Sequence, residues 1–312
     1  MNGMTKRLRT ALVTRGHTEP LKRGDVKPRT FEFDFEEVPV IVKAFRRMVR
    51  GLEFDICEMA MTTYLCARSF GKAFTAIPVF PMRAFHHGAI LCHTNSGVRT
   101  PKDLEGRRVG VNRGYTVTTG LWNRAILRHE YGVDLSKITW VLSGDEHVAE
   151  YRPPPNVVPI DPGTTLEDLL MRGEIAAAIG VQVESPDVKP LIPDAKEAAY
   201  ASLRERGLYP INHTVVIRNE VLEADPGVAA DLFDAFVRAK AIYVDRLKRG
   251  QVDPTAPNDQ SALHRRVMEI TGDPLPYGVE PNRRMIDAIV QYSVEQGILP
   301  RPVAVDELFA AT

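Results

Sequence analysis

The segment Phe80–His87 holds the densest group of residues that could carry chemistry: Arg83 and the adjacent histidines His86 and His87. An arginine presents a planar fork that binds a carboxylate through two hydrogen bonds. A histidine can donate or accept a proton near neutral pH. The same residue types also suit a solvated loop in which one histidine packs or caps. This segment is therefore one candidate for a catalytic and anion-binding site.

Glu58 and His213 are two further candidates for catalytic residues. Glu58 follows an apolar run, and a carboxylate at the carboxyl end of a strand is well placed for a ligand cleft. The alternative for Glu58 is an exposed acid at a helix start. His213 leads into an apolar run and either faces a cleft or packs as a structural residue. Both could join His86 and His87 in a metal site, but the chain has no HxxxH, HxH or HExxH spacing, so we expect no metal.

Two other segments could hold an anion. Arg15 and His17 lie in a polar loop after a first apolar run. Tyr115, Thr116 and Thr118 precede a helical pattern, where hydroxyls and free backbone N–H groups can bind an anion or a threonine can simply cap the helix. The other histidines have no supporting neighbours and are expected to be structural or exposed: His93, His129, His147 and His264.

The composition excludes several classes of function. The 312 residues carry 40 Lys and Arg against 40 Asp and Glu, so no global field favours nucleic acid. The N-terminus lacks the apolar run of a signal peptide, and no stretch is apolar enough to span a membrane. Three cysteines without CxxC spacing suggest neither a disulfide framework nor a zinc site. We expect a soluble, cytoplasmic protein without nucleic-acid or membrane partners.

Short apolar strands alternate with amphipathic helices, which predicts an α/β fold. Strands are expected at 9–14 and 53–57. A helix is expected from Ile41 with Gly51 as its C-cap, and another from Asp225 to Gly250.

Two segments look like crossovers between lobes, one near 89–95 and one near 212–219. They predict a discontinuous first lobe, 1–90 plus 218–312, and a second lobe, 91–217. Such a two-lobed arrangement would place the ligand site in a central cleft.

Four motifs resemble those of 4,5-dihydroxyphthalate decarboxylases: Phe80–His87, Pro101–Val111, Gly272–Gly278 with Asn282-Arg283, and Tyr292–Pro302. The similarity runs over nearly the whole length. The Pro101 motif is common to type II periplasmic-binding-protein folds, whereas the Phe80 and Gly272 motifs are more specific. The resemblance implies that two-lobed fold, used by a cytoplasmic, homo-oligomeric enzyme.

The chain departs from the family pattern at four positions. It has His86 where members carry arginine, Gly88 where they carry serine, and His17 and Glu19 where arginines are usual. Because arginine-rich loops suit a dicarboxylate, these departures also admit a substrate with one carboxylate. Tyr277 matches the family and is expected to contact the substrate.

The expected reaction is the non-oxidative, cofactor-free decarboxylation of a hydroxylated aromatic acid. His87 is the expected proton donor to the ring, with His86 or His213 second, and Glu58 the expected partner of the ring hydroxyl. The expected carboxylate anchors are Arg83, Arg15 and the helix start at Tyr115–Thr118. Two alternatives stay open: a solute-binding or sensor protein of the same fold, and a lyase of quinone biosynthesis.

Overall fold

The computed structural model describes residues 6–312 and divides into two compact units. The first unit comprises the chain up to Arg83 together with 213–286 and 303–312; the second comprises 84–212 and 287–302. Residues 287–302, predicted in the first lobe, group with the second unit. Arg124 Nε donates to Gln296 Oε1 at 2.7 Å, and the ring of Trp122 meets the edge of Tyr292.

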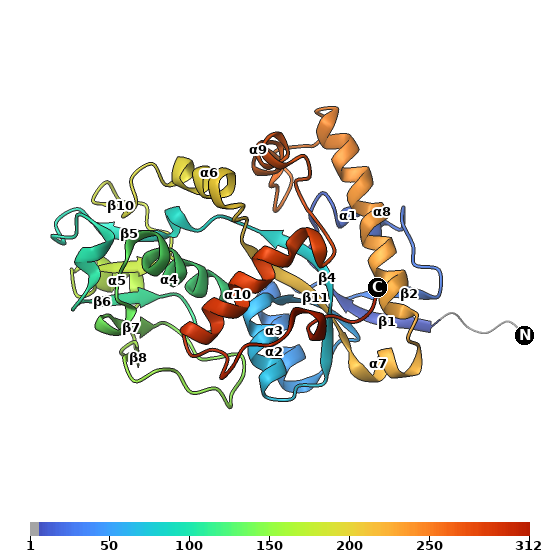
Figure 1. Ribbon diagram of the computed structural model, residues 1–312, viewed down its shortest axis with the longest axis horizontal. Helices are drawn as coiled ribbons and strands as arrows, with labels where there is room; N and C mark the ends of the chain where they lie inside the picture. The colour runs from blue at the N-terminus through green and yellow to red at the C-terminus, as the bar shows by residue number, and fades with distance from the viewer. Residues whose placement is uncertain (1–5) are drawn as a thin grey trace, which may run out of the picture. The chain divides into compact units, whose positions relative to one another are not determined.

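The first unit is built on a five-stranded sheet in the order β2-β1-β3-β11-β4 (Figure 1). Its strands are β1 (Lys6–Ala11), β2 (Phe31–Phe35), β3 (Ile56–Ala60), β4 (Phe74–Arg83) and β11 (Ile211–Arg218). β1 pairs in parallel with β2 and β3, whereas β11 pairs antiparallel with β3. The helices are α1 (Glu19–Arg23), α2 (Ile41–Gly51), α3 (Met61–Ser69), α7 (Asn219–Ala224), α8 (Val228–Lys248) and α9 (Ser261–Thr271).

The second unit has a six-stranded sheet in the order β10-β5-β9-β6-β7-β8. These strands are β5 (Ile90–His93), β6 (Arg108–Val111), β7 (Thr139–Leu142), β8 (Val157–Pro159), β9 (Ala177–Ile179) and β10 (Val188–Pro190). Its helices are α4 (Thr118–Tyr131), α5 (Leu166–Met171) and α6 (Ala195–Arg206), and α10 (Arg283–Glu295) begins in the first unit and continues into the second. The alternation of strands and helices confirms the predicted α/β class.

Short 3-10 helices lie in the segments that connect or follow these elements: η1 (His87–Ala89), η2 (Pro101–Leu104), η3 (Leu135–Lys137), η4 (Glu280–Asn282) and η5 (Val305–Glu307).

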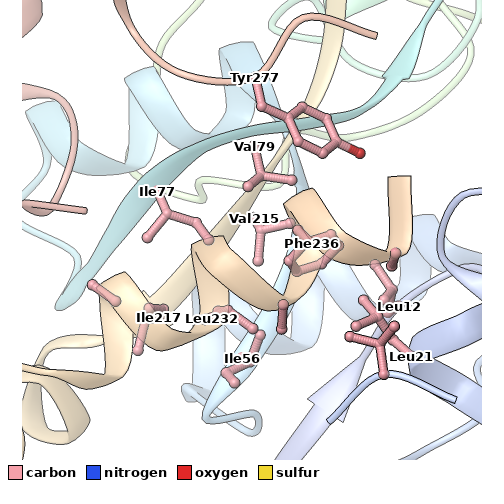
Figure 2. Packing of buried hydrophobic residues seen from close by; sticks show 14 of the residues in the cluster. Leu12, Leu21, Ile56, Ile77, Val79, Val215, Ile217, Leu232, Phe236 and Tyr277 are labelled. Atoms are coloured by element: carbon pink, nitrogen blue, oxygen red, sulfur yellow. The ribbon is translucent and has the colours of Figure 1, made fainter. Parts of the chain in front are cut away.

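The core of the first unit lies where α8 packs against the sheet. Ile56, Val215 and Ile217 from the strands meet Leu232 and Phe236 of α8, and all five side chains are buried (Figure 2). This interface fixes the sheet that carries Glu58 and His213, which are described below.

Tyr277 lies at the edge of the same cluster. Its hydroxyl points away from the aliphatic side chains (Figure 2). The ring therefore belongs to the core, and the buried hydroxyl has no hydrogen-bond partner within the described residues.

Four predicted boundaries were wrong. The strand predicted at 9–14 runs instead from Lys6 to Ala11. The strand predicted at 53–57 runs instead from Ile56 to Ala60, so Glu58 lies inside it rather than after it. α2 continues through Gly51, and its left-handed C-cap is Leu52, with φ of 50°. α8 begins at Val228 after the N-cap Gly227, because the Asp225 carboxylate accepts the Gly227 N–H outside the helix.

Candidate active site

Glu58 is the centre of a polar cluster in the first unit, and its side chain is fully buried. Oε1 accepts hydrogen bonds from Arg15 Nη2 at 2.8 Å and from His213 Nδ1 at 2.6 Å. Oε2 accepts from Arg15 Nη1 at 3.0 Å and from the Val13 N–H at 3.0 Å. Both oxygens are therefore committed to the protein.

The sheet register explains how residues so far apart in sequence meet. Val215 of β11 lies opposite Glu58 of β3, so their side chains share one face of the sheet. His213, two residues before Val215, lies on that face on the diagonal from Glu58, within reach of a long side chain. Arg15 arrives from the loop that follows β1, which pairs in parallel with β3.

Electrostatics keep Glu58 ionised. Burial alone would favour its neutral acid, but the nearby Arg15 guanidinium and the His213 hydrogen bond together hold the pKa of Glu58 well below its usual range. A buried carboxylate that holds an imidazole by one nitrogen fixes the orientation of the ring and stabilises its protonated form. The pair can therefore present His213 as a proton donor.

The loop that carries Arg15 is held tightly. The Thr18 hydroxyl accepts the Arg15 N–H at 2.8 Å and donates to the Val13 carbonyl at 2.7 Å. A Cβ on Gly16 would lie 2.4 Å from Cε2 of Tyr243, so only glycine allows the loop to pack against that ring. Local packing thus fixes where Arg15 and its neighbour His17 can point.

His17 and His264 are buried neighbours, with ring centroids 6.0 Å apart. His17 Nε2 is 3.0 Å from the Pro81 carbonyl, and His264 Nδ1 is 2.7 Å from the Tyr243 hydroxyl. Burial lowers the pKa of His264 to about 4, and burial together with the charge at His264 lowers that of His17. No sequence motif surrounds His264, which was predicted to be structural or exposed, and the structure shows that it is buried.

Arg83, which the sequence analysis singled out, is buried and tied to two of the family-like motifs. Its Nη1 donates to Asn282 Oδ1 at 2.8 Å. Asn282 Nδ2 in turn donates to the carbonyls of Pro276 and Gly278 at 2.9 and 2.8 Å. Asn282 therefore couples the Gly272–Gly278 segment to the arginine at the end of β4. Burial raises the pKa of Tyr277 in that segment, so its hydroxyl stays protonated.

His86 and His87 lie in the second unit, each with a partner of its own. His87 Nε2 is 2.9 Å from Glu130 Oε2, and Glu130 Oε1 is 2.5 Å from Arg206 Nη2. His86 Nε2 is 3.2 Å from Asn212 Oδ1, and burial lowers the pKa of His86 to about 4. The structure thus brings Glu58 and His213 together in one unit and places the adjacent histidines in the other.

The predicted anion site at Tyr115–Thr118 already holds a carboxylate of the chain itself. The backbone N–H groups of Tyr115 and Thr116 and the Thr116 hydroxyl all donate to Glu146. The N-cap of α4 is Val117, and Thr118 is the first helical residue, so no threonine caps this helix. The backbone there binds an anion, as its geometry predicts, but that anion is Glu146.

Residues 6–312 lack two features that would indicate other kinds of site. No group of three or more His, Cys, Asp or Glu side chains in this range is arranged to hold a metal ion. In the same range, no helix is long and apolar enough to cross a membrane.

Known structures share the fold at low sequence identity. The chain matches the aliphatic sulphonate binding protein SsuA of Escherichia coli with a TM-score of 0.55 and 13% identity, over 98% of this chain and 97% of that one. It matches the desulfurization enzyme DSZB with a TM-score of 0.56 and 13% identity, over 98% and 96%. A Candida albicans protein described as having the generic periplasmic binding protein fold matches with a TM-score of 0.54 and 14% identity, over 96% of this chain and 92% of that one. These matches confirm the predicted binding-protein-like fold, and they include both a periplasmic binding protein and an enzyme.

Curated relatives show the family. No protein-family model matches the chain. It is 33% identical to 4,5-dihydroxyphthalate decarboxylase of Comamonas testosteroni, over 93% of this chain and 92% of the relative. It is also 34% identical to 4,5-dihydroxyphthalate decarboxylase of Pseudomonas putida, over 50% of this chain and 65% of that relative. The chain belongs to the 4,5-dihydroxyphthalate decarboxylase family, a family of carboxy-lyases.

Proposed function

We propose that this protein removes one carboxylate as CO2 from a hydroxylated aromatic acid, 4,5-dihydroxyphthalate or a close analogue. The observation that carries the proposal is the match to a decarboxylase over more than nine-tenths of both chains. The fold itself does not decide between this activity and ligand binding, because a fold hosts unrelated functions. The pair of Glu58 and His213 supplies the proton donor that the proposed reaction needs.

The reaction replaces a carboxylate by a proton. A ring hydroxyl para to the carboxylate donates electron density, and the carbon that bears the carboxylate accepts a proton. The bond to the carboxylate then breaks, CO2 leaves, and the electron pair of that bond restores the aromatic ring. The net change is one proton consumed and one CO2 released, so the enzyme must supply a proton and accommodate the developing charge.

His213, held by Glu58, is the proton donor that the geometry supports best. Its side chain keeps 17% exposure, whereas the His87 side chain keeps 3%. Glu58 then serves as a positioning residue through His213 and Arg15, and not as a base on the ring hydroxyl, because its oxygens are already occupied. His87, with its own carboxylate partner Glu130, is the alternative donor.

Arg83 and Arg15 have different parts in this proposal. Arg15 uses both terminal nitrogens on Glu58 and so acts chiefly on the carboxylate that orients His213. Arg83, held by Asn282, is the proposed anchor for a carboxylate that the substrate retains. The cytoplasmic location and the homo-oligomer that the resemblance implies stay predictions.

The test incubates chelator-treated protein with 4,5-dihydroxyphthalate as substrate. Chromatography then measures the product, 3,4-dihydroxybenzoate. We expect product from the wild type and a loss of about 100-fold or more in kcat for His213→Asn, since general acid catalysis typically contributes about that much. The same loss in His87→Asn, with His213→Asn near the wild-type rate, would move the donor role to His87. Binding without product throughout would overturn the proposed function.

A further inference from the structure

Three buried polar atoms of the first unit belong to side chains on which the charge of Arg15 acts: His17 Nδ1, His264 Nε2 and the Tyr277 hydroxyl. None of them has a hydrogen-bond partner within the described part of the chain. Buried polar atoms are nearly always hydrogen-bonded, so three such atoms in one electrostatic neighbourhood call for an explanation.

The contact of His17 Nε2 determines whether Nδ1 of the same ring is a donor or an acceptor. Nε2 faces the Pro81 carbonyl, which can only accept, so Nε2 carries the proton. In the neutral ring, Nδ1 is then a lone-pair acceptor. An acceptor of this kind binds an O–H group.

His264 is held by Tyr243, whose hydroxyl is 2.7 Å from Nδ1. The ring of Tyr243 also contacts His17, with centroids 5.7 Å apart, and the contact with Gly16 fixes that ring against the loop. Nε2 of His264 is therefore, with Nδ1 of His17, one of two imidazole nitrogens here without a hydrogen-bond partner in the described residues. Two imidazole rings 6.0 Å apart can reach two adjacent oxygens of one ligand.

The charge state of the two histidines selects the kind of group they bind. Burial and the positive charge of Arg15 favour the neutral form of both rings. A substrate carboxylate would instead call for protonated histidines or arginines. Neutral imidazoles match hydroxyls, which can both donate and accept.

We infer that His17 and His264 form the recognition site for the vicinal ring hydroxyls of the substrate, with Tyr243 as a positioning residue for His264. The inference rests on the proposed function, since it names the part of a dihydroxylated aromatic acid that residues of the first unit bind. It assigns a binding role to His264, which stands apart from every motif in the sequence.

The test compares three dicarboxylates that differ only in their hydroxyls: 4,5-dihydroxyphthalate, 4-hydroxyphthalate and phthalate. Isothermal titration gives the ratio of their dissociation constants for each variant. His264→Asn keeps a polar atom near the position of Nδ1, beside Tyr243, but removes Nε2. His264→Gln instead places a polar atom near the position of Nε2. We expect His264→Asn to reduce the preference for the dihydroxylated ligand by about tenfold, as loss of a hydrogen bond predicts, with phthalate binding unchanged.

His264→Gln should recover part of the preference, and Tyr243→Phe should lose part of it through the freed His264 ring. The matched control is Tyr131→Phe, at the end of α4 in the second unit, which should leave all three affinities unchanged. Circular dichroism checks that each variant is folded.

Two results would overturn the inference: a wild type that binds phthalate as tightly as 4,5-dihydroxyphthalate, or folded His264→Asn and Tyr243→Phe variants with an unchanged preference. These outcomes are separate from failure of the proposed function. If the wild type makes no product but prefers the dihydroxylated ligand, and His264→Asn and Tyr243→Phe reduce that preference, the recognition site alone is upheld. Normal turnover, with a preference that these variants leave unchanged, would uphold the decarboxylase alone.

Discussion

Replacing Glu58 with glutamine tests the buried ion pair directly. The substitution keeps the shape of the side chain, but it removes the charge that faces Arg15 and His213 and turns one acceptor into a donor. Arg15 is 6% exposed, so its guanidinium would remain as a buried, uncompensated charge. Breaking a buried pair by removing one partner costs about 3–5 kcal/mol, and we expect Glu58→Gln to lower the free energy of unfolding by that amount.

Urea denaturation at neutral pH measures this loss. Glu32→Gln, an exposed change on β2 of the same sheet, is the matched control and should stay within about 0.5 kcal/mol of the wild type. A folded Glu58→Gln variant that loses less than about 1 kcal/mol of unfolding free energy would contradict the role of this ion pair in stability, because it would mean that Arg15 and His213 do not depend on the carboxylate.

The pH dependence gives a second readout of the same pair. The pKa of Glu58 is lowered in the folded protein relative to its unfolded value of about 4.3. The unfolded state therefore binds more protons below that value, so the stability that Glu58 contributes is complete above about pH 4.3 and is lost as the pH falls toward the folded pKa. Glu58→Gln should show a shallower loss of stability in this acid range than the wild type.

Three further outcomes are expected. Burial lowers the pKa of His264 to about 4, so the unfolded state binds more protons than the folded state between about pH 6.5 and 4. As the pH falls through this window, the wild type should lose up to about 3 kcal/mol of unfolding free energy. Denaturation at several pH values should show a smaller loss for His264→Gln. Gly16→Ala should destabilise by about 1–3 kcal/mol, since its Cβ would overlap Tyr243; an unchanged melting curve would contradict that contact. Glu146→Gln should cost about 1–3 kcal/mol by weakening the bonds from Tyr115 and Thr116, and an unchanged denaturation midpoint would show that Glu146 is not held there.

The fold class followed from local patterns, but the position of Glu58 did not. A glutamate after an apolar run looks like the end of a strand, because a charged side chain inside a buried strand is costly on its own. Here the strand continues to Ala60, since Arg15 and His213 compensate the charge. That compensation comes from residues distant in sequence, which periodicity does not reveal.

The candidate site shows the same limit. Arg83 and Tyr277 stood in recognisable motifs, and the structure shows Asn282 as their link. His264 had no local signal, because its partners Tyr243 and His17 come from other elements. The helix start at Tyr115 was recognisable as an anion site, but its occupant, Glu146, lies on a separate loop and depends on tertiary structure.

The proposed decarboxylation is tested most sharply by turnover of 4,5-dihydroxyphthalate in D2O, followed by NMR of the aromatic product and by CO2 release. We predict one CO2 per molecule of 3,4-dihydroxybenzoate, with deuterium at the ring carbon that lost its carboxylate. The ring positions that carry hydrogen in the substrate should keep it. A ligand that raises the melting temperature while no CO2 appears would contradict the claim and identify the protein as a binder of aromatic acids.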